Sequence, residues 1–209
     1  MAVKERARRR SDVARPLSGH VVARGVSEVF SPLLVNAVLL FVIALHRAPS
    51  LVVGLKWAAI AITFVTLIPQ AIIVLGVRRN RLSDRHVRVR AQRPVLIVLA
   101  LLSIVVGLGI LAALHASREL LALLAAMLVG LVVTLLVTLF WKVSLHTSTF
   151  AGAVTILVIA FGPVFALLYP LIVLIGWARV ELGDHSLAQV IAGMVLGTVV
   201  AESVFTFLR

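Results

Sequence analysis

Three polar tracts interrupt an otherwise apolar chain, and they hold most of the residues that could do chemistry. They cover residues 78–94, 142–149 and 177–189 and read RRNRLSDRHVRVRAQRP, KVSLHTST and WARVELGDHSLAQ. Guanidinium groups match the oxygens of a phosphate through paired hydrogen bonds. Histidine can act near neutral pH as a nucleophile or a proton donor. The tracts therefore predict a site for a phosphate ester.

The same residue types argue against a metal. The acidic residues of the tracts, Asp84, Glu181 and Asp184, are scattered singly and form no cluster that would hold a divalent cation. The chain has no cysteine, which excludes disulfides, thiolate metal sites and cysteine nucleophiles. We therefore expect chemistry that uses neither a metal nor a cofactor.

The elements that carry the tracts are apolar helices. Of the 209 residues, 62% are hydrophobic and 13% are charged, whereas a soluble domain has about half and about a quarter. About 20 helical residues cross a bilayer core of about 30 Å. The apolar blocks cover residues 30–45, 51–77, 94–114, 120–141, 146–161, 163–178 and 187–208. Because the first, fifth and sixth blocks are short, the predicted fold is an all-α polytopic membrane bundle of six or seven transmembrane helices.

The number of crossings brings the tracts to one membrane face. Two apolar blocks separate the first tract from the second, and two more separate the second from the third. An even number of crossings returns the chain to the same side each time. The three tracts can therefore converge on one site.

The distribution of Lys and Arg predicts the orientation. With seven spans, sixteen of the 20 cationic residues lie on the side of the N-terminus and the tracts, and four on the other. Cytoplasmic loops carry the excess of Lys and Arg, so we expect the N-terminus and the tracts to be cytoplasmic. A composition rich in Ala, Val, Leu and Arg hints at a GC-rich genome, and we expect a bacterial plasma membrane.

The first 28 residues are a separate unit. They carry seven Lys and Arg against three acidic residues, so we expect a flexible basic tail, followed by a membrane domain over residues 29–209. Such a tail could bind nucleic acid, but beside a membrane span it more often lies on anionic lipid head groups. We expect membrane lipids rather than nucleic acid as its partner. Nothing in the sequence predicts an oligomeric state.

In order and spacing, the tracts resemble the three signature motifs of the type 2 phosphatidic acid phosphatase superfamily. That family's pattern is K-x6-R-P, then P-S-G-H, then S-R-x5-H-x3-D. The resemblance covers roughly residues 78–197. The matching residues are Arg93 and Pro94 in the first motif, Ser144 and His146 in the second, and Arg179 and His185 in the third, with Gly193 and Gly197 in the helix that follows.

The resemblance implies a membrane phosphatase that hydrolyses a lipid phosphate or diphosphate without a metal. His185 would attack the phosphorus and form a phospho-histidine, and His146 would protonate the leaving lipid oxygen. Arg93, Arg179 and Ser144 would hold the phosphoryl oxygens. Isoprenoid phosphates or diphosphates, phosphatidic acid and phosphatidylglycerophosphate all fit as substrates.

The chain departs from the pattern at several positions. His86 stands where the family has its phosphate-binding Lys, so His86 itself, Arg88 or Arg90 would take that role. Gln189 stands where the family has Asp. An i, i+4 spacing puts it on the same helix face as His185, where its amide oxygen can orient the imidazole but cannot neutralise it. The other departures are Val143, Leu145 and Ala178.

Two carboxylates of the third tract could compensate for the neutral side chain of Gln189. Asp184 and Glu181 are candidates to supply the charge that Gln189 lacks.

Two alternative functions remain. A lipid-phosphate binding or scaffold protein is the main one, since the altered motifs could mark lost catalysis. A lipid phosphotransferase is the other. Taken singly, each tract also fits an ordinary positive loop or polar helix cap. Trp57, Trp141 and Trp177 are predicted to anchor the chain at the membrane interfaces.

Overall fold

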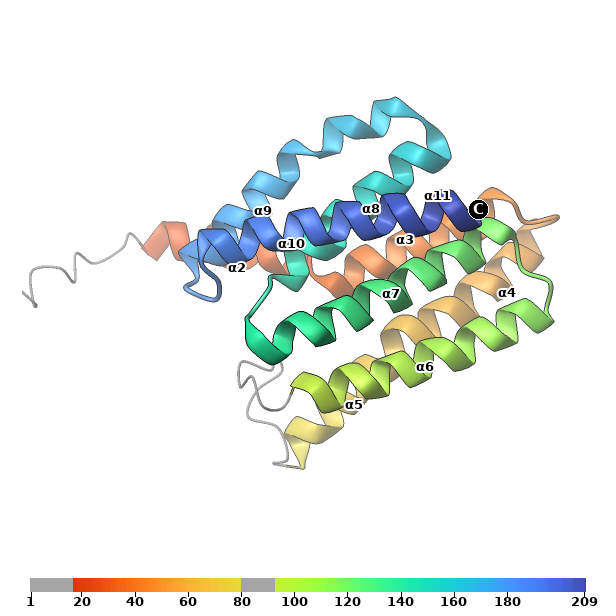
Figure 1. Cartoon of the computed structure of the whole chain (residues 1–209), viewed down its shortest axis with the longest axis horizontal. Coiled ribbons are helices and arrows are strands. Elements are labelled where there is room, and N and C mark those ends of the chain that lie inside the picture. The colour runs from red at the N-terminus through yellow and green to blue at the C-terminus, as the bar shows by residue number, and fades with distance from the viewer. Residues whose placement is uncertain (1–16, 80–92) are drawn as a thin grey trace, which may run out of the picture.

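The computed structural model describes residues 17–79 and 93–209, and these form a bundle of helices that run back and forth along one long axis (Figure 1). Within these two ranges there is no β-strand. Six helices are long and apolar enough to cross a membrane, and the helix over Leu145–Phe161 is apolar but shorter. The all-α polytopic fold predicted from the sequence is confirmed.

The helices agree closely with the apolar blocks. Each of Ser31, Ser50, Ser117, Ser144 and Ser186 caps a helix, its side chain accepting a hydrogen bond from the backbone N–H three residues later. In chain order the elements are α2 (Leu17–Val29), α3 (Pro32–His46), α4 (Leu51–Ile62), η1 (Thr63–Leu67), α5 (Ile68–Arg78), α6 (Arg93–Ala113), α7 (Arg118–Phe140), α8 (Leu145–Phe161), η3 (Pro163–Leu168), α9 (Pro170–Glu181), α10 (Leu187–Val200), η4 (Ala201–Phe205) and α11 (Thr206–Leu208).

The first span is longer than the sequence indicated. α2 joins α3 through a break before Pro32, and together they provide a candidate span over Gly19–His46. α2 packs along α9, with Ala23 and Ser27 buried. The predicted tail boundary at residue 28 therefore differs from the structure, in which the helix begins at Leu17. The expectation of a flexible basic tail otherwise falls on residues 1–16, which lie outside the described residues.

Glycine lets α8 and α10 pack backbone to backbone. A Cβ atom added to Gly193 would lie 2.5 Å from the carbonyl oxygen of Ser144, and one added to Gly197 would overlap the carbonyl oxygen of Ser148. Small residues four apart are the usual means by which membrane helices approach so closely. This contact fixes the start of α8 against the first turns of α10.

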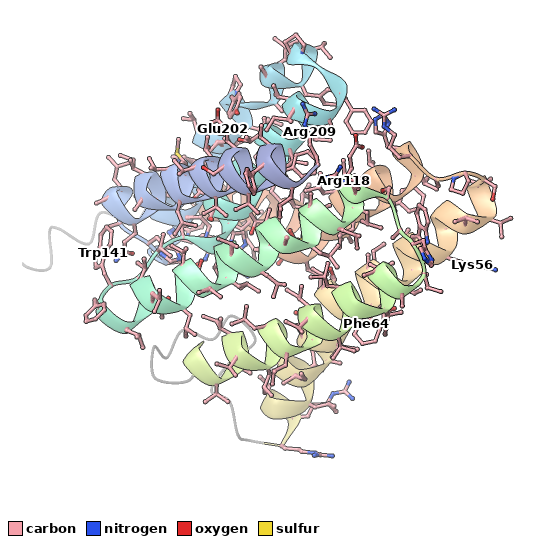
Figure 2. All side chains as sticks on the ribbon, turned by 45° about the vertical axis from the view of Figure 1, so that its right-hand side comes forward. Lys56, Phe64, Arg118, Trp141, Glu202 and Arg209 are labelled. Atoms are coloured by element: carbon pink, nitrogen blue, oxygen red, sulfur yellow. The ribbon has the colours of Figure 1, made fainter. Side chains whose placement is uncertain are left out.

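The tryptophans divide between core and surface. Trp57 is 6% exposed and packs in the main core cluster, so its predicted role as an interface anchor is wrong. Trp141 and Trp177 are 43% and 41% exposed. Trp141 lies at the end of the bundle opposite Lys56 and Arg118 (Figure 2).

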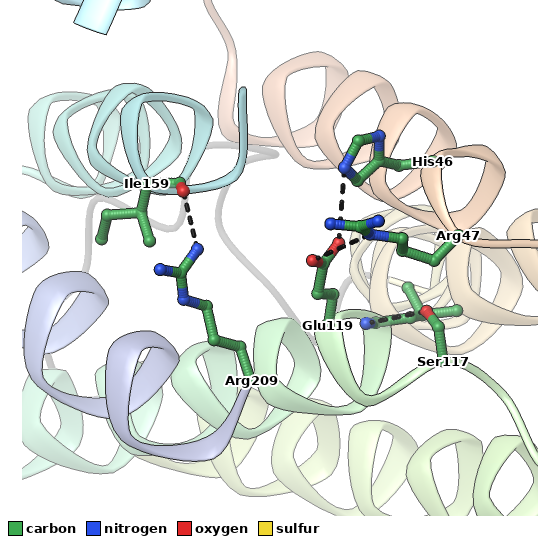
Figure 3. A network of polar contacts seen from close by, with 7 residues as sticks. His46, Arg47, Ser117, Glu119, Ile159 and Arg209 are labelled. Carbon is green, nitrogen blue, oxygen red and sulfur yellow. Dashed lines mark hydrogen bonds and ion pairs between the residues drawn. The ribbon is translucent and has the colours of Figure 1, made fainter. Parts of the chain in front are cut away.

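A polar network ties the helices together at that opposite end (Figure 3). Glu119 Oε1 accepts a hydrogen bond from Arg47 Nε at 3.3 Å, and Glu119 Oε2 lies 3.8 Å from His46 Nε2. Arg209 donates to the carbonyl oxygen of Ile159 at 2.7 Å. The network joins the end of α3 to the start of α7, and the C-terminus to α8.

Candidate functional site

The second and third tracts meet where α8 and α10 begin. The backbone N–H of Ser144 donates to the carbonyl oxygen of Gln189 at 3.2 Å, and the hydroxyl of Thr147 donates to the carbonyl oxygen of Val190 at 3.1 Å. Ser144 and Thr147 are both fully buried. The second tract is thus joined by direct hydrogen bonds to residues 43 and 45 positions further along the chain.

His185 sits in the turn between α9 and α10. The chain leaves α9 through Gly183, whose φ of 68° is in the left-handed region that favours glycine. The backbone N–H of His185 then donates to the carbonyl oxygen of Arg179 at 3.3 Å, which holds the turn against the end of α9. The imidazole Nδ1 lies 3.2 Å from Gln189 Oε1.

A second contact of Gln189 decides which imidazole nitrogen carries the proton. Gln189 Oε1 also accepts the backbone N–H of Ser186 at 3.2 Å, while Ser186 Oγ accepts the backbone N–H of Gln189. This reciprocal capping box requires an oxygen, not an NH2 group, at that position. The imidazole nitrogen that faces this oxygen must then be the donor, so Nδ1 carries hydrogen and the lone pair of a neutral His185 is on Nε2.

Arg179 is the buried cation of the site. Its side chain is 7% exposed, and one guanidinium nitrogen lies 2.8 Å from Asp184 Oδ2. Another donates to the hydroxyl of Ser27 on α2 at 3.4 Å. Asp184, one of the two carboxylates proposed as a charge source for His185, is therefore in an ion pair with Arg179. The other, Glu181, lies 3.8 Å from His20 Nε2.

Residues 138–209 match the sequence model of the PAP2 superfamily. The matched part runs from the last turn of α7 to the C-terminus and contains Ser144, His146, Arg179, His185 and Gln189. The C-terminal third of this chain is thus similar to the PAP2 superfamily. With its apolar spans the chain is an integral, multi-pass membrane protein. No curated protein and no solved structure gives a significant match.

Two further motif positions, His146 and Arg93, lie at the same end of the bundle. His146 is half-buried in the first turn of α8, at the end of the bundle where His185 lies. Arg93 begins α6 at this same end (Figure 1). The side chain of Arg93 lies outside the described residues, as do His86, Arg88 and Arg90 of the first tract. Their phosphate-binding roles remain predictions.

The site also depends on residues that the sequence did not single out. Ser186 completes the capping box, and the pattern of Ser followed three residues later by Gln is a signal that could have found it. Ser27 gave no signal, because it lies in a segment that reads as a polar tail. In the described ranges, no group of three or more acidic or histidine side chains could hold a metal ion.

Proposed function

We propose that this protein is a membrane phosphatase that hydrolyses a lipid phosphate or diphosphate through a phospho-histidine on His185. The observation that carries the proposal is the hydrogen bond between His185 Nδ1 and Gln189 Oε1. With Nδ1 as the hydrogen-bond donor, the lone pair of the neutral imidazole is on Nε2, the atom that would attack phosphorus. Substrate, mechanism and site residues all belong to this proposal.

The chemistry proceeds in two displacements. The Nε2 lone pair of His185 forms a bond to phosphorus while the bond from phosphorus to the lipid oxygen breaks, and His146 gives that oxygen a proton. His146, now neutral, takes a proton from a water molecule as the water attacks phosphorus. The bond between phosphorus and Nε2 breaks, releasing inorganic phosphate and restoring His185.

Cationic and hydrogen-bond donors hold the phosphoryl oxygens in this proposal. Arg179 has five N–H donors, and in this proposal the guanidinium contacts the phosphate as well as Asp184. Ser144 lies where the second tract meets the third. Arg93, with His86, Arg88 or Arg90 from the first tract, supplies further donors. Positive charge placed before the reaction stabilises the charge that develops on these oxygens.

Two observations favour a non-catalytic alternative. The guanidinium of Arg179 already holds a carboxylate at 2.8 Å, and the residue that orients His185 is a neutral amide. A lipid-phosphate binding protein would tolerate both features, because it needs affinity for phosphate but no stabilised imidazolium.

Phosphate release in the presence of EDTA tests the proposal. Purified full-length protein in detergent is given prenyl phosphate, prenyl diphosphate and phosphatidic acid, with His185→Ala in parallel. We expect release that survives EDTA and is lost in the variant. Folded protein that releases no more phosphate than His185→Ala overturns the hydrolase. Dephosphorylated lipid formed without equivalent free phosphate would indicate a phosphotransferase instead.

We also propose the location of the site. The excess of Lys and Arg beside the three tracts supports a cytoplasmic N-terminus and a cytoplasmic site in a bacterial plasma membrane, with the basic N-terminal residues on anionic head groups.

A further inference from the structure

The N-terminal helix α2 packs closely against α9, the helix that carries Arg179. The side of α2 that faces α9 buries Ala23 and Ser27. Gly19, Ala23 and Ser27 follow one another at intervals of four residues, so they share one face of the helix. Small residues at this spacing let helices in a membrane approach closely. α2 therefore comes near enough to α9 for a side chain as short as serine to reach it.

Contacts at both ends of α2 fix it in this position. Near its start, His20 Nε2 lies 3.8 Å from Glu181 Oε1 at the end of α9. Just beyond its end, the ring of Phe30 meets that of Phe150 on α8 edge to face, with 5.3 Å between the ring centroids. Phe30 also packs against the buried cluster that α8 and α9 share. Ser27 is thus held between two anchored points.

Ser27 contacts the buried cation of the candidate site. Its hydroxyl accepts a hydrogen bond from Arg179 Nη1 at 3.4 Å, across 152 residues of sequence. Ser27 is 6% exposed and the side chain of Arg179 is 7% exposed, so water cannot readily replace the hydroxyl. Ser27 lies outside residues 138–209, the part of the chain that matches the PAP2 superfamily.

Ser27 and Asp184 hold different nitrogens of one guanidinium group. Asp184 Oδ2 lies 2.8 Å from Nη2 of Arg179, and Ser27 Oγ lies 3.4 Å from Nη1. Because the guanidinium group is planar, contacts at its two terminal nitrogens, together with the stem, define the orientation of its plane. Asp184 belongs to the turn that carries His185, whereas Ser27 belongs to α2. The orientation of Arg179 thus depends on the N-terminal helix as well as on the turn.

We propose that Ser27 is a positioning residue for Arg179, and that α2 is thereby part of the phosphate site. A long arginine side chain loses conformational entropy when a ligand orders it, and a side chain that is already held in place loses less. Ser27 therefore raises the affinity for phosphate without contacting the phosphate itself. The inference rests on the proposed function for the assignment of Arg179 as a phosphate ligand.

Binding of inorganic phosphate tests this role without requiring catalysis. Titration calorimetry measures the dissociation constant of phosphate for purified full-length protein in detergent at constant ionic strength. Ser27→Ala removes the hydroxyl and keeps the side chain small enough for the contact with α9. We expect the dissociation constant to rise by about threefold to tenfold, the effect of one lost hydrogen bond. Ser27→Thr, which retains a hydroxyl, should restore most of the affinity.

Phe30→Leu is the control for looser packing of α2. It disturbs the ring contact with Phe150 on α8 and leaves the hydroxyl of Ser27 in place. We expect a lower melting temperature and a phosphate affinity close to that of the wild type. A loss of affinity as large as in Ser27→Ala, at equal folded fraction, would show that packing and not the hydrogen bond sets the affinity. That result would overturn the role of Ser27.

A double-mutant cycle shows whether Ser27 acts through Arg179. Arg179→Lys replaces the planar guanidinium by a point charge, which has no plane for Ser27 to orient. Ser27→Ala should therefore have little further effect on phosphate affinity when Arg179 is already lysine. Additive losses in the double variant would show that the two residues act independently, which contradicts the inference.

Steady-state kinetics separates this inference from the proposed function. With a lipid phosphate that the wild type hydrolyses, Ser27→Ala should raise KM and leave kcat nearly unchanged, the pattern of binding lost equally from substrate and transition state. Phosphate binding that depends on Ser27, in a protein that releases no phosphate, would overturn the hydrolase and leave the role of Ser27 standing. Hydrolysis whose KM is the same in Ser27→Ala would do the reverse. Wild-type protein that binds no inorganic phosphate would also overturn the inference.

Discussion

Gln189 Oε1 lies 3.2 Å from His185 Nδ1 and 3.2 Å from the backbone N–H of Ser186. One amide oxygen thus caps α10 and fixes the tautomer of the proposed nucleophile. The capping role constrains the orienting role, because the oxygen cannot rotate away from His185 without leaving the Ser186 N–H unpaired. A carboxylate at this position would add a negative charge to the same geometry.

Acidic and apolar substitutions of Gln189 should therefore change turnover in opposite directions. Gln189→Glu retains side-chain length and adds a charge that stabilises the imidazolium, so we expect phosphate release to rise several-fold. Gln189→Leu should lower it by about 10²-fold or more, since Nδ1 loses its acceptor. Gln189→Asp, with the carboxylate of the family's motif, should maintain or raise it.

Ser186→Ala is the control for this series. It removes the side-chain half of the capping box, costing about 1 kcal/mol of stability, but leaves Gln189 Oε1 beside His185. A loss of turnover in Ser186→Ala as large as in Gln189→Leu would show that helix capping, and not orientation of the imidazole, explains the effect. In a pure binding protein none of these variants would release phosphate.

Asp184→Asn should make stability depend on phosphate. Removing the carboxylate leaves the buried guanidinium of Arg179 without its counter-charge, which is strongly destabilising. We expect a lower melting temperature that inorganic phosphate partly restores, because an anion that binds only the folded state stabilises it. Thermal unfolding with phosphate and with chloride at equal ionic strength measures this. An unfolding temperature that phosphate leaves unchanged would argue against Arg179 as a phosphate ligand.

The close contact of α8 with α10 predicts intolerance of side chains at Gly197. Gly197→Ala would push its Cβ into the carbonyl of Ser148. Overpacking of this kind costs about 1–3 kcal/mol and should also separate Ser144 from Gln189. Gly130→Ala is the comparison, because its Cβ would make only an ordinary contact of 3.8 Å with Val200. Yield of folded protein and phosphate release should both fall in the first variant and not in the second.

The network at the far end should matter for stability alone. Glu119 is 14% exposed and contacts both His46 and Arg47. Glu119→Gln removes the charge from this cluster, and we expect a loss of about 1–3 kcal/mol, as for other buried hydrogen-bonded charges. Phosphate release per folded molecule should remain unchanged, because the cluster lies at the opposite end of the bundle from His185. A lower specific activity at equal folded fraction would indicate coupling between the two ends.

Orientation can be tested cleanly because the chain contains no cysteine. Leu187→Cys lies at the motif end and Leu114→Cys at the other, and both positions are exposed. In intact bacterial cells, a membrane-impermeant maleimide should label Leu114→Cys and leave Leu187→Cys unlabelled until the cells are lysed. The reverse pattern would place the site outside the cytoplasm.

The sequence by itself determined most of the spans and the face on which the second and third tracts meet. Bilayer thickness and local hydropathy set the helix boundaries, and serine caps mark several of them, so these features need no knowledge of distant contacts. An even number of crossings then places the second and third tracts on the same face. The four-residue spacing of His185 and Gln189 is likewise local, but His185 lies in the turn before α10, so the contact crosses the start of the helix and does not run along one helix face.

Only the tertiary structure decided which residues contact one another across the bundle. The helix over Leu17–Val29 reads as a polar tail until α9 is available to pack against it. Trp57 reads as an interface anchor, yet the packing of the neighbouring helices buries it. The pairing of Arg179 with Ser27, and the cavity between α3, α7 and α8, depend on how closely helices far apart in the sequence approach. Those distances are set by glycine contacts and by side-chain packing across the bundle, which no local pattern of residues records.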